Sequence, residues 1–234
     1  MTASDSLAFG YKISRVKRLK RFLRSSVDPR AYLHFLRIMN FYNHSHVIPR
    51  RQLTIGRACA ISPDVNFMHG ERIFLGDRVS LASRCFLWAG PGQGTIVLED
   101  DVLLGPEVVI TAATYRYNAG SPVTEQPMRE SNIHIGRDVW IGCRAMIMPG
   151  VTLGAGCIVG AGAIVTKSFP AGSVLVGTPA RLVRMRHYPL NPMDNAPSWE
   201  SRLAGWRHDG DAPQEDAAAD SETGAGSLLS LIHI

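Results

Sequence analysis

The strongest pattern in the sequence is an aliphatic residue at every sixth position from residue 135 to residue 165. A glycine often follows this residue, and a small or β-branched residue stands four positions after it. The aliphatic positions are Ile135, Ile141, Ile147, Leu153, Val159 and Val165, and the smaller ones are Val139, Ala145, Val151, Cys157 and Ala163. A period of six matches neither the helical period of about 3.6 residues nor the two-residue alternation of a strand.

The six-residue period predicts a coil of triangular cross-section, in which each side is one short strand followed by one corner. The aliphatic residue points inward, and the smaller residue fills the corner, where a large side chain would not fit. Stacked coils pair as parallel strands about 4.8 Å apart. The repeat runs through residues 52–110 and 133–182, with a last turn read from Val176, Ala180 and Leu182. This length predicts an all-β solenoid of about six coils.

The repeat stops between residues 111 and 132, a segment that includes Asn118, Gly120, Pro122 and Pro127. Such residues are typical of loops, so this segment is predicted to be ejected from the coil. A long loop in a compact solenoid usually has a function.

Two helices are predicted before the coil. Residues 12–24 place apolar side chains at helical spacing among Lys and Arg, and a second helix begins near Asp28-Pro29 and runs to about Tyr42. The first helix fits two interpretations: a surface helix drawn to anionic lipid, or an amphipathic helix that packs on the rest of the protein. Nucleic-acid binding is not expected, because no stacking aromatics alternate with the basic residues.

Charge divides the chain into three parts. Residues 1–51 carry 11 Lys and Arg against 2 acidic residues, residues 52–186 carry 12 against 10, and residues 187–234 carry 2 against 8. We therefore expect a basic helical segment, a β-helix domain and a flexible acidic tail. Residues 229–234 read like a translated DNA-library adapter and are left out of the fold prediction. No secretory signal or membrane-spanning run is visible, so a cytoplasmic location is expected.

Metal binding is not expected from the four cysteines. Cys59, Cys85, Cys143 and Cys157 form no C-x-x-C pair, and no histidine stands at metal-ligand spacing from them. In an intracellular chain they are best interpreted as small buried thiols.

Residues 50–186 resemble the hexapeptide-repeat acyltransferases, a family of left-handed parallel β-helix proteins that includes galactoside and maltose acetyltransferases. The resemblance is carried by residues 135–142, 160–167 and 176–181. It implies an acetyl transfer from acetyl-CoA to a hydroxyl or amine of a sugar, in polysaccharide or cell-surface glycan synthesis. It also implies a homotrimer with its sites between subunits, near the ejected loop.

The same resemblance implies which residues bind coenzyme A. Trp140 and Gly142 would line the thioester end, and Gly160 and Ala161 would contact the pantetheine arm through their backbone. Close to the nucleotide end would lie Lys167, Thr178, Pro179 and Arg181. The coil needs glycine and alanine at its corners in any case, so these small residues have a structural explanation as well.

The catalytic histidine of the family is replaced here by Tyr115. Histidine titrates near 6.5 and tyrosine near 10, so ionising Tyr115 at neutral pH costs roughly 4 kcal/mol unless a cation such as Arg116 assists. His46 and Glu125 are alternative bases, and His134 and His69 are weaker candidates. An amine acceptor that is already deprotonated would need only proximity and orientation.

Two functions therefore remain open. One is the acetyltransferase; the other is a non-catalytic trimer that binds glycan or acts as a scaffold at a membrane surface. The missing histidine favours the second, and the intact Trp140, Lys167 and Gly177–Arg181 positions favour the first. A peripheral contact of residues 12–24 with the inner face of an anionic membrane is compatible with both.

Overall fold

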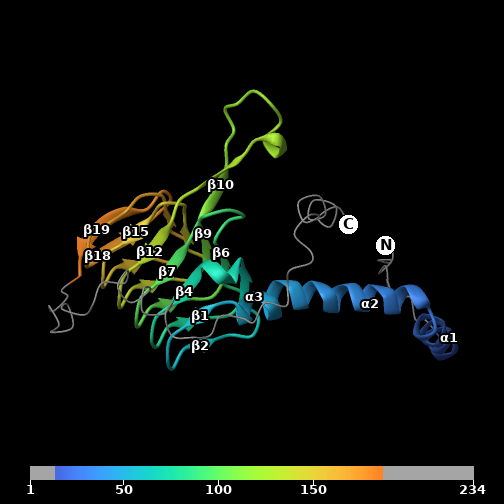
Figure 1. Cartoon of the computed structure of the whole chain (residues 1–234). Coiled ribbons are helices and arrows are strands. Elements are labelled where there is room, and N and C mark those ends of the chain that lie inside the picture. The colour runs from blue at the N-terminus through green and yellow to red at the C-terminus, as the bar shows by residue number, and fades with distance from the viewer. Residues whose placement is uncertain (1–13, 187–234) are drawn as a thin grey trace, which may run out of the picture. The chain divides into compact units, whose positions relative to one another are not determined.

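A computed structural model describes residues 14–186 as a parallel β-helix preceded by helices (Figure 1). Three strands, one on each side, form a coil, and strands of successive coils pair in parallel. The predicted fold class is confirmed, and the architecture fits a left-handed β-helix. Residues 1–13 and 187–234, which include the start of the basic helix, the acidic tail and the adapter-like hexamer, lie outside the described part.

Each side of the triangular coil is one sheet. The first sheet contains β1 (Thr54–Ile55), β4 (Ile73–Leu75), β7 (Ile96–Leu98), β12 (Ile133–Ile135) and β15 (Thr152–Leu153). The second contains β2 (Ala60–Ile61), β5 (Ser80–Leu81), β8 (Leu103–Leu104), β13 (Trp140–Ile141), β16 (Ile158–Val159), β18 (Ser173–Val176) and β19 (Arg181–Met185). The third contains β3 (Asn66–Met68), β6 (Phe86–Trp88), β9 (Val109–Thr111), β14 (Met146–Ile147) and β17 (Ile164–Val165).

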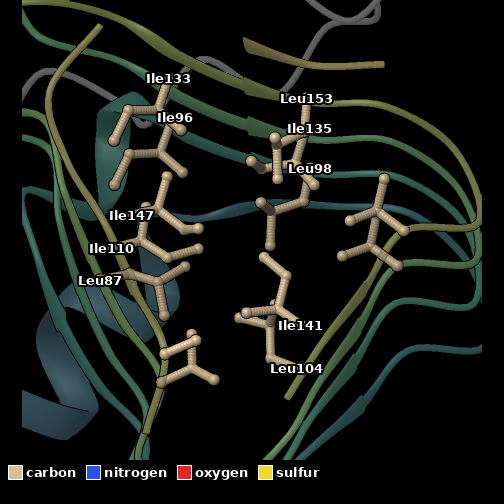
Figure 2. Packing of buried hydrophobic residues seen from close by; sticks show 14 of the residues in the cluster. Leu87, Ile96, Leu98, Leu104, Ile110, Ile133, Ile135, Ile141, Ile147 and Leu153 are labelled. Carbon is tan, nitrogen blue, oxygen red and sulfur yellow. The ribbon is translucent and has the colours of Figure 1, made fainter. Parts of the chain in front are cut away.

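The core is a set of aliphatic columns along the axis of the coil. Figure 2 shows Leu98, Ile135 and Leu153 in one such column, and their strands pair in that register. All six predicted inward positions between residues 135 and 165 are buried, as are the five smaller corner residues. Burial of this kind is the main source of stability in a repeat protein.

The coil count is lower than predicted: residues 14–186 form five complete coils, followed by two sides of a sixth, which are a parallel bridge at Phe169 and β18. After β18 the chain passes Gly177 and turns back as β19, which pairs antiparallel with β18. Leu182 is therefore not an inward residue; it lies opposite Leu175 and is 47% exposed. The spacing that predicted a further coil at residues 176–182 belongs to this terminal hairpin.

The thiols only partly follow the prediction. Cys85 and Cys157 are buried at corners, and this burial raises the pKa of both thiols. Cys59 is half-buried in the first coil. Cys143 is exposed, so its assignment as a buried thiol is wrong; it follows Gly142 on the outer side of a corner. Within residues 14–186, no three potential metal-ligand side chains come together.

The N-terminal segment consists of α1 (Arg15–Ser26), α2 (Pro29–Tyr42), the π-helix η1 (Asn43–Val47) and α3 (Ile48–Arg51). The Asp28 carboxylate accepts a hydrogen bond from the Arg30 N–H at 2.9 Å, which caps α2. No residue of α1 or α2 is buried. None of the described helices is long and apolar enough to cross a bilayer.

We expect Ile135→Ala to lower the free energy of unfolding by about 2–5 kcal/mol, because it leaves a cavity between two packed neighbours. Thr152→Ala, on the outer face of the adjacent strand, should change it by less than about 0.5 kcal/mol. Urea denaturation measures both. Equal losses would contradict a core built from inward columns.

Candidate active site

The segment ejected from the coil is an antiparallel hairpin that stands away from the solenoid (Figure 1). Its stem is β10 (Ala113–Tyr115) and β11 (Met128–Glu130), with Tyr115 opposite Met128. Near its far end lies the 3₁₀-helix η3 (Val123–Glu125). The buried amide of Gln126 accepts from the Ala119 N–H at 3.1 Å and donates to the Ser121 carbonyl at 2.6 Å. The hairpin therefore has an ordered far end as well as a paired stem.

Glu130 ties the stem of the hairpin to the coil. Its carboxylate accepts hydrogen bonds from the N–H groups of Gly92, Gln93 and Gly94, at 2.7, 2.5 and 2.7 Å. Partial burial opposes the charged form, but these three donors outweigh it and lower the pKa of Glu130 below its ordinary value. The hairpin is thus held by charge-assisted bonds at its base.

Arg72 holds the same glycine-rich segment through its carbonyl groups. The guanidinium donates to the carbonyl oxygens of Gly90 and Gly92 at 2.5 and 2.6 Å. Gly94 has no room for a side chain, since a Cβ there would lie 2.2 Å from the Ala89 carbonyl oxygen. Arg72, residues 90–94 and Glu130 together form a clamp. We had not predicted it; the glycine cluster in the sequence was the available signal.

The three candidate bases lie on different elements. Tyr115 ends β10 and is 40% exposed, with Arg116 exposed beside it. Glu125 is exposed in η3, and His46 lies on η1 before the coil. Among residues 14–186, no hydrogen bond or ion pair connects these three side chains. Only Tyr115 is both exposed and fixed in the stem of the hairpin.

The two weaker histidine candidates already have partners. His134 Nε2 lies 2.9 Å from Glu99 Oε1. Burial of Glu99 favours its neutral form, but the bonds from His134 and the Arg137 N–H lower its pKa nonetheless. His69 stands at a corner with φ of 61°, and its Nδ1 atom lies 3.5 Å from Glu71 Oε1. Both histidines therefore contribute to the coil itself.

The structure brings several predicted coenzyme residues together along one corner of the coil. A Cβ on Gly142 would lie 2.7 Å from the Ala161 nitrogen, and one on Gly160 would lie 2.9 Å from Val176 Cγ1. Thr178 Oγ1 donates to the Gly162 carbonyl at 3.3 Å. These corners therefore stack in one line, which is the arrangement needed to bind an extended arm.

The backbone donors predicted to hold that arm are in part used by the coil. The Gly142 N–H donates to Val159 O at 2.8 Å, and the Gly160 N–H donates to Leu175 O at 2.7 Å. Ala161, one residue on, is exposed. The close approach of neighbouring coils therefore explains why both positions are glycine, even if no ligand binds there.

Side chains predicted at the two ends of the coenzyme are accessible. Trp140 faces outward on β13 and is 50% exposed. Lys167 Nζ lies 5.5 Å from the centre of the Phe169 ring. The Thr178–Pro179 peptide bond is cis, and Arg181 begins β19 with its side chain exposed.

Comparison with known proteins decides the family. Residues 132–167 match the model of the bacterial transferase hexapeptide family, built of six repeats. Galactoside O-acetyltransferase of Escherichia coli K12 is 32% identical over 161 residues, which cover 63% of this chain and 75% of that protein. The chain belongs to the hexapeptide-repeat acetyltransferases. The predicted class of enzyme is thereby confirmed.

Solved acetyltransferases of the family share the fold. One from Vibrio cholerae, complexed with acetyl-CoA, matches with a TM-score of 0.54 and 25% identity over 72% of this chain and 83% of its own. A galactoside acetyltransferase in complex with CoA matches with a TM-score of 0.56 and 28% identity over 70% and 87%. Their ligands agree with the expected donor. A probable acetyltransferase of Mycobacterium tuberculosis is 25% identical, and the chain spans 61% of its length.

A second feature that we had not predicted lies on β6. The Trp88 Nε1 atom is buried and has no hydrogen-bond partner within the described residues. Trp88 pairs in register with Thr111, directly before the hairpin begins. A buried donor without a partner is uncommon in native structures. We therefore add Trp88 to the candidate residues near the stem of the hairpin.

We expect Glu130→Gln to release the hairpin and to reduce acetyl transfer by about tenfold or more, because the charge of the acceptor is lost. Since the pKa of Glu130 is lowered in the folded state, the tether is intact above the ordinary carboxyl range. These hydrogen bonds to Glu130 are lost as the pH falls through the pKa that Glu130 has in the folded state. Amide exchange in β10 and β11 measures this.

Arg129→Gln is the matched control for this variant, since Arg129 is exposed on the same strand. Its exchange rates should equal those of the unaltered protein. Unchanged protection of β10 and β11 in Glu130→Gln would contradict the clamp.

Proposed function

We propose that this enzyme transfers an acetyl group from acetyl-CoA to a hydroxyl or amine of a sugar during polysaccharide or cell-surface glycan synthesis. The main support is that the chain belongs to a family of acetyltransferases whose solved members hold acetyl-CoA or CoA, and that Trp140 and Arg181 are exposed at the positions expected to meet the coenzyme. A relative of this chain acts on galactosides. A sugar acceptor is therefore the first class to test.

In this reaction, the acceptor oxygen or nitrogen attacks the thioester carbonyl carbon and forms a tetrahedral oxyanion. The carbon–sulfur bond then breaks, the acetyl group stays on the acceptor, and the thiolate of CoA takes a proton. A base must remove the proton of the acceptor, and N–H groups must stabilise the oxyanion. Trp140 lines the thioester end, and Lys167 and Arg181 pair with the phosphates of the nucleotide.

Tyr115 is our first candidate for the base, because it is exposed on the ordered stem of the hairpin. His46 and Glu125 are the alternatives; Glu125 lies within the hairpin, and His46 would approach the site of an adjacent subunit.

We further propose a homotrimer with its sites between subunits, located at the cytoplasmic face of a membrane. Support for membrane contact comes from α1. Val16, Leu19, Phe22 and Leu23 are all more than half exposed among basic residues. Apolar side chains with a Lys- and Arg-rich opposite face suit an anionic lipid surface.

The second candidate function is a non-catalytic trimer that binds glycan or serves as a membrane scaffold. What favours it is Tyr115, since the resemblance implies that the catalytic histidine of the family would stand at this position. This protein would bind coenzyme A or glycan without turnover.

We expect Tyr115→Phe to lower kcat for acetyl transfer by about 100-fold or more and to leave the Kd for coenzyme A unchanged, since only proton removal is affected. Tyr117→Phe, two residues further along, is the matched control and should retain full activity. Release of free thiol is followed across neutral sugars and amino sugars, with His46→Ala and Glu125→Gln in parallel.

Loss of activity in His46→Ala or Glu125→Gln alone would transfer the role of base to that residue. Binding of coenzyme A without turnover on every acceptor would favour the scaffold. Absence of binding would refute the assignment of the donor.

We expect the protein to sediment with vesicles that contain phosphatidylserine and not with neutral phosphatidylcholine vesicles. Replacement of Arg18 and Arg21 by Glu should reduce bound protein by about tenfold or more, because each basic residue near an anionic surface contributes about 1 kcal/mol. The charge-matched control replaces Arg129 and Arg184, which are exposed in β11 and β19, by Glu. Equal binding of both variants would contradict a role of α1.

A further inference from the structure

An open cavity of about 360 Å³ lies where the N-terminal segment meets the first coil. Its lining residues are His46, Val47, Arg50, Arg51 and Pro63. The first four come from η1 and α3, and Pro63 comes from the turn between β2 and β3. The volume falls within the range of about 300–1,000 Å³ typical of small-molecule sites.

The helix that carries His46 has an unusual backbone. Residues Asn43–Val47 form a π-helix between two α-helices, and such insertions are rare and frequently mark functional sites. Ser45 Oγ lies 2.6 Å from His46 Nδ1, and the imidazole stacks on Tyr42 with ring centres 4.8 Å apart. With Nδ1 engaged in this way, the Nε2 atom remains for a ligand.

The ionisable side chains that line the cavity are all basic ones. Residues 29–63 include five arginines, three histidines and no Asp or Glu. Asp64 is the next carboxylate in the sequence, and it accepts a hydrogen bond from Ser62 Oγ at 2.8 Å. The cavity therefore has no carboxylate among its lining residues.

Both arginines of the cavity retain free donors. Arg50 Nη2 donates to the Ile61 carbonyl at 3.3 Å, which fixes the guanidinium against the coil. Within residues 14–186, neither Arg50 nor Arg51 forms an ion pair. Two guanidinium groups next to an oriented imidazole provide the donors that a phosphate group accepts, since Arg binds phosphate through paired N–H groups.

We propose that this cavity binds a phosphate group of the acceptor, so that the enzyme acetylates a phosphorylated sugar. The assignment of the phosphate to the acceptor rests on the proposed function. The binding of phosphate in the cavity does not depend on it. Sugar phosphates in solution and sugar phosphates attached to lipid share this chemistry, and α1 would bring the cavity close to the second source.

The test measures binding of pyrophosphate and glucose 1-phosphate to the full chain by calorimetry, with no acetyl-CoA present. Arg51→Gln is expected to weaken binding about tenfold, and Arg50→Gln/Arg51→Gln by more, since each removes charge-assisted hydrogen bonds. Arg57→Gln, in the first coil but outside the cavity, is the matched control. Melting temperatures show whether each variant is folded. Because Arg51 is exposed, we expect the single variant Arg51→Gln to stay folded and to test the proposal even if the double variant unfolds.

Equal affinity in Arg51→Gln and Arg57→Gln would overturn the proposal, as would absence of binding to the unaltered protein. Displacement of pyrophosphate by coenzyme A would also overturn it, because the cavity would then belong to the donor. Competition by vesicles that contain a lipid-linked sugar phosphate, but not by phosphatidylglycerol vesicles, would support the lipid source. Competition by glucose 1-phosphate alone would support the soluble one.

These results are separable from the proposed function. A protein that binds pyrophosphate through Arg51 but releases no thiol with any acceptor would retain the phosphate site and lose the transferase. A protein that acetylates neutral sugars but binds no phosphate would retain the transferase function and lose the phosphate site.

Discussion

The structure depends on how closely the backbone of one coil approaches the next. Parallel strands pair at a fixed distance of about 4.8 Å, and at several corners that carry glycine there is no space for a side chain between the coils. A Cβ on Gly136 or Gly142 would lie 2.7 Å from a backbone nitrogen of the following coil, and one on Gly154 would lie 2.3 Å away. The small residues are thus a condition for stacking, and the inward aliphatic columns follow from it.

The same constraint determines where chemistry can be placed. A segment inside the coil must turn at a corner every six residues, so an element that projects from the coil has to come from a segment that leaves this repeat. The hairpin β10–β11 is such a segment, and the clamp of Arg72 and Glu130 gives it a defined base. Rigid coils and one tethered hairpin together provide a surface against which two substrates can be aligned.

The periodic part of the molecule could be predicted from sequence because each six-residue unit obeys a local rule. The hairpin could be placed, since it interrupts that rule, but its clamp could not: Glu130 contacts residues 36–38 positions earlier in the chain. The sixth coil was predicted wrongly for a related reason. Leu182 has the spacing of an inward residue, and only the reversal after β18 shows that it pairs with Leu175. Likewise, the sequence does not show the π-helix that carries His46, so the cavity that His46 lines together with Arg50 could not be predicted.

A period of six leaves the chain with a problem of register, because sliding one coil by a whole side would still point every aliphatic residue inward. Ion pairs between coils remove this ambiguity. Arg78 reaches Asp101 at 2.6 Å, and Glu107 binds Arg84 in the coil before it and Arg144 in the coil after it. Surface pairs of this kind stabilise a fold only weakly, but a slip of six residues would separate all of them at once. Their contribution is to select one stacking among several that the core alone would accept equally.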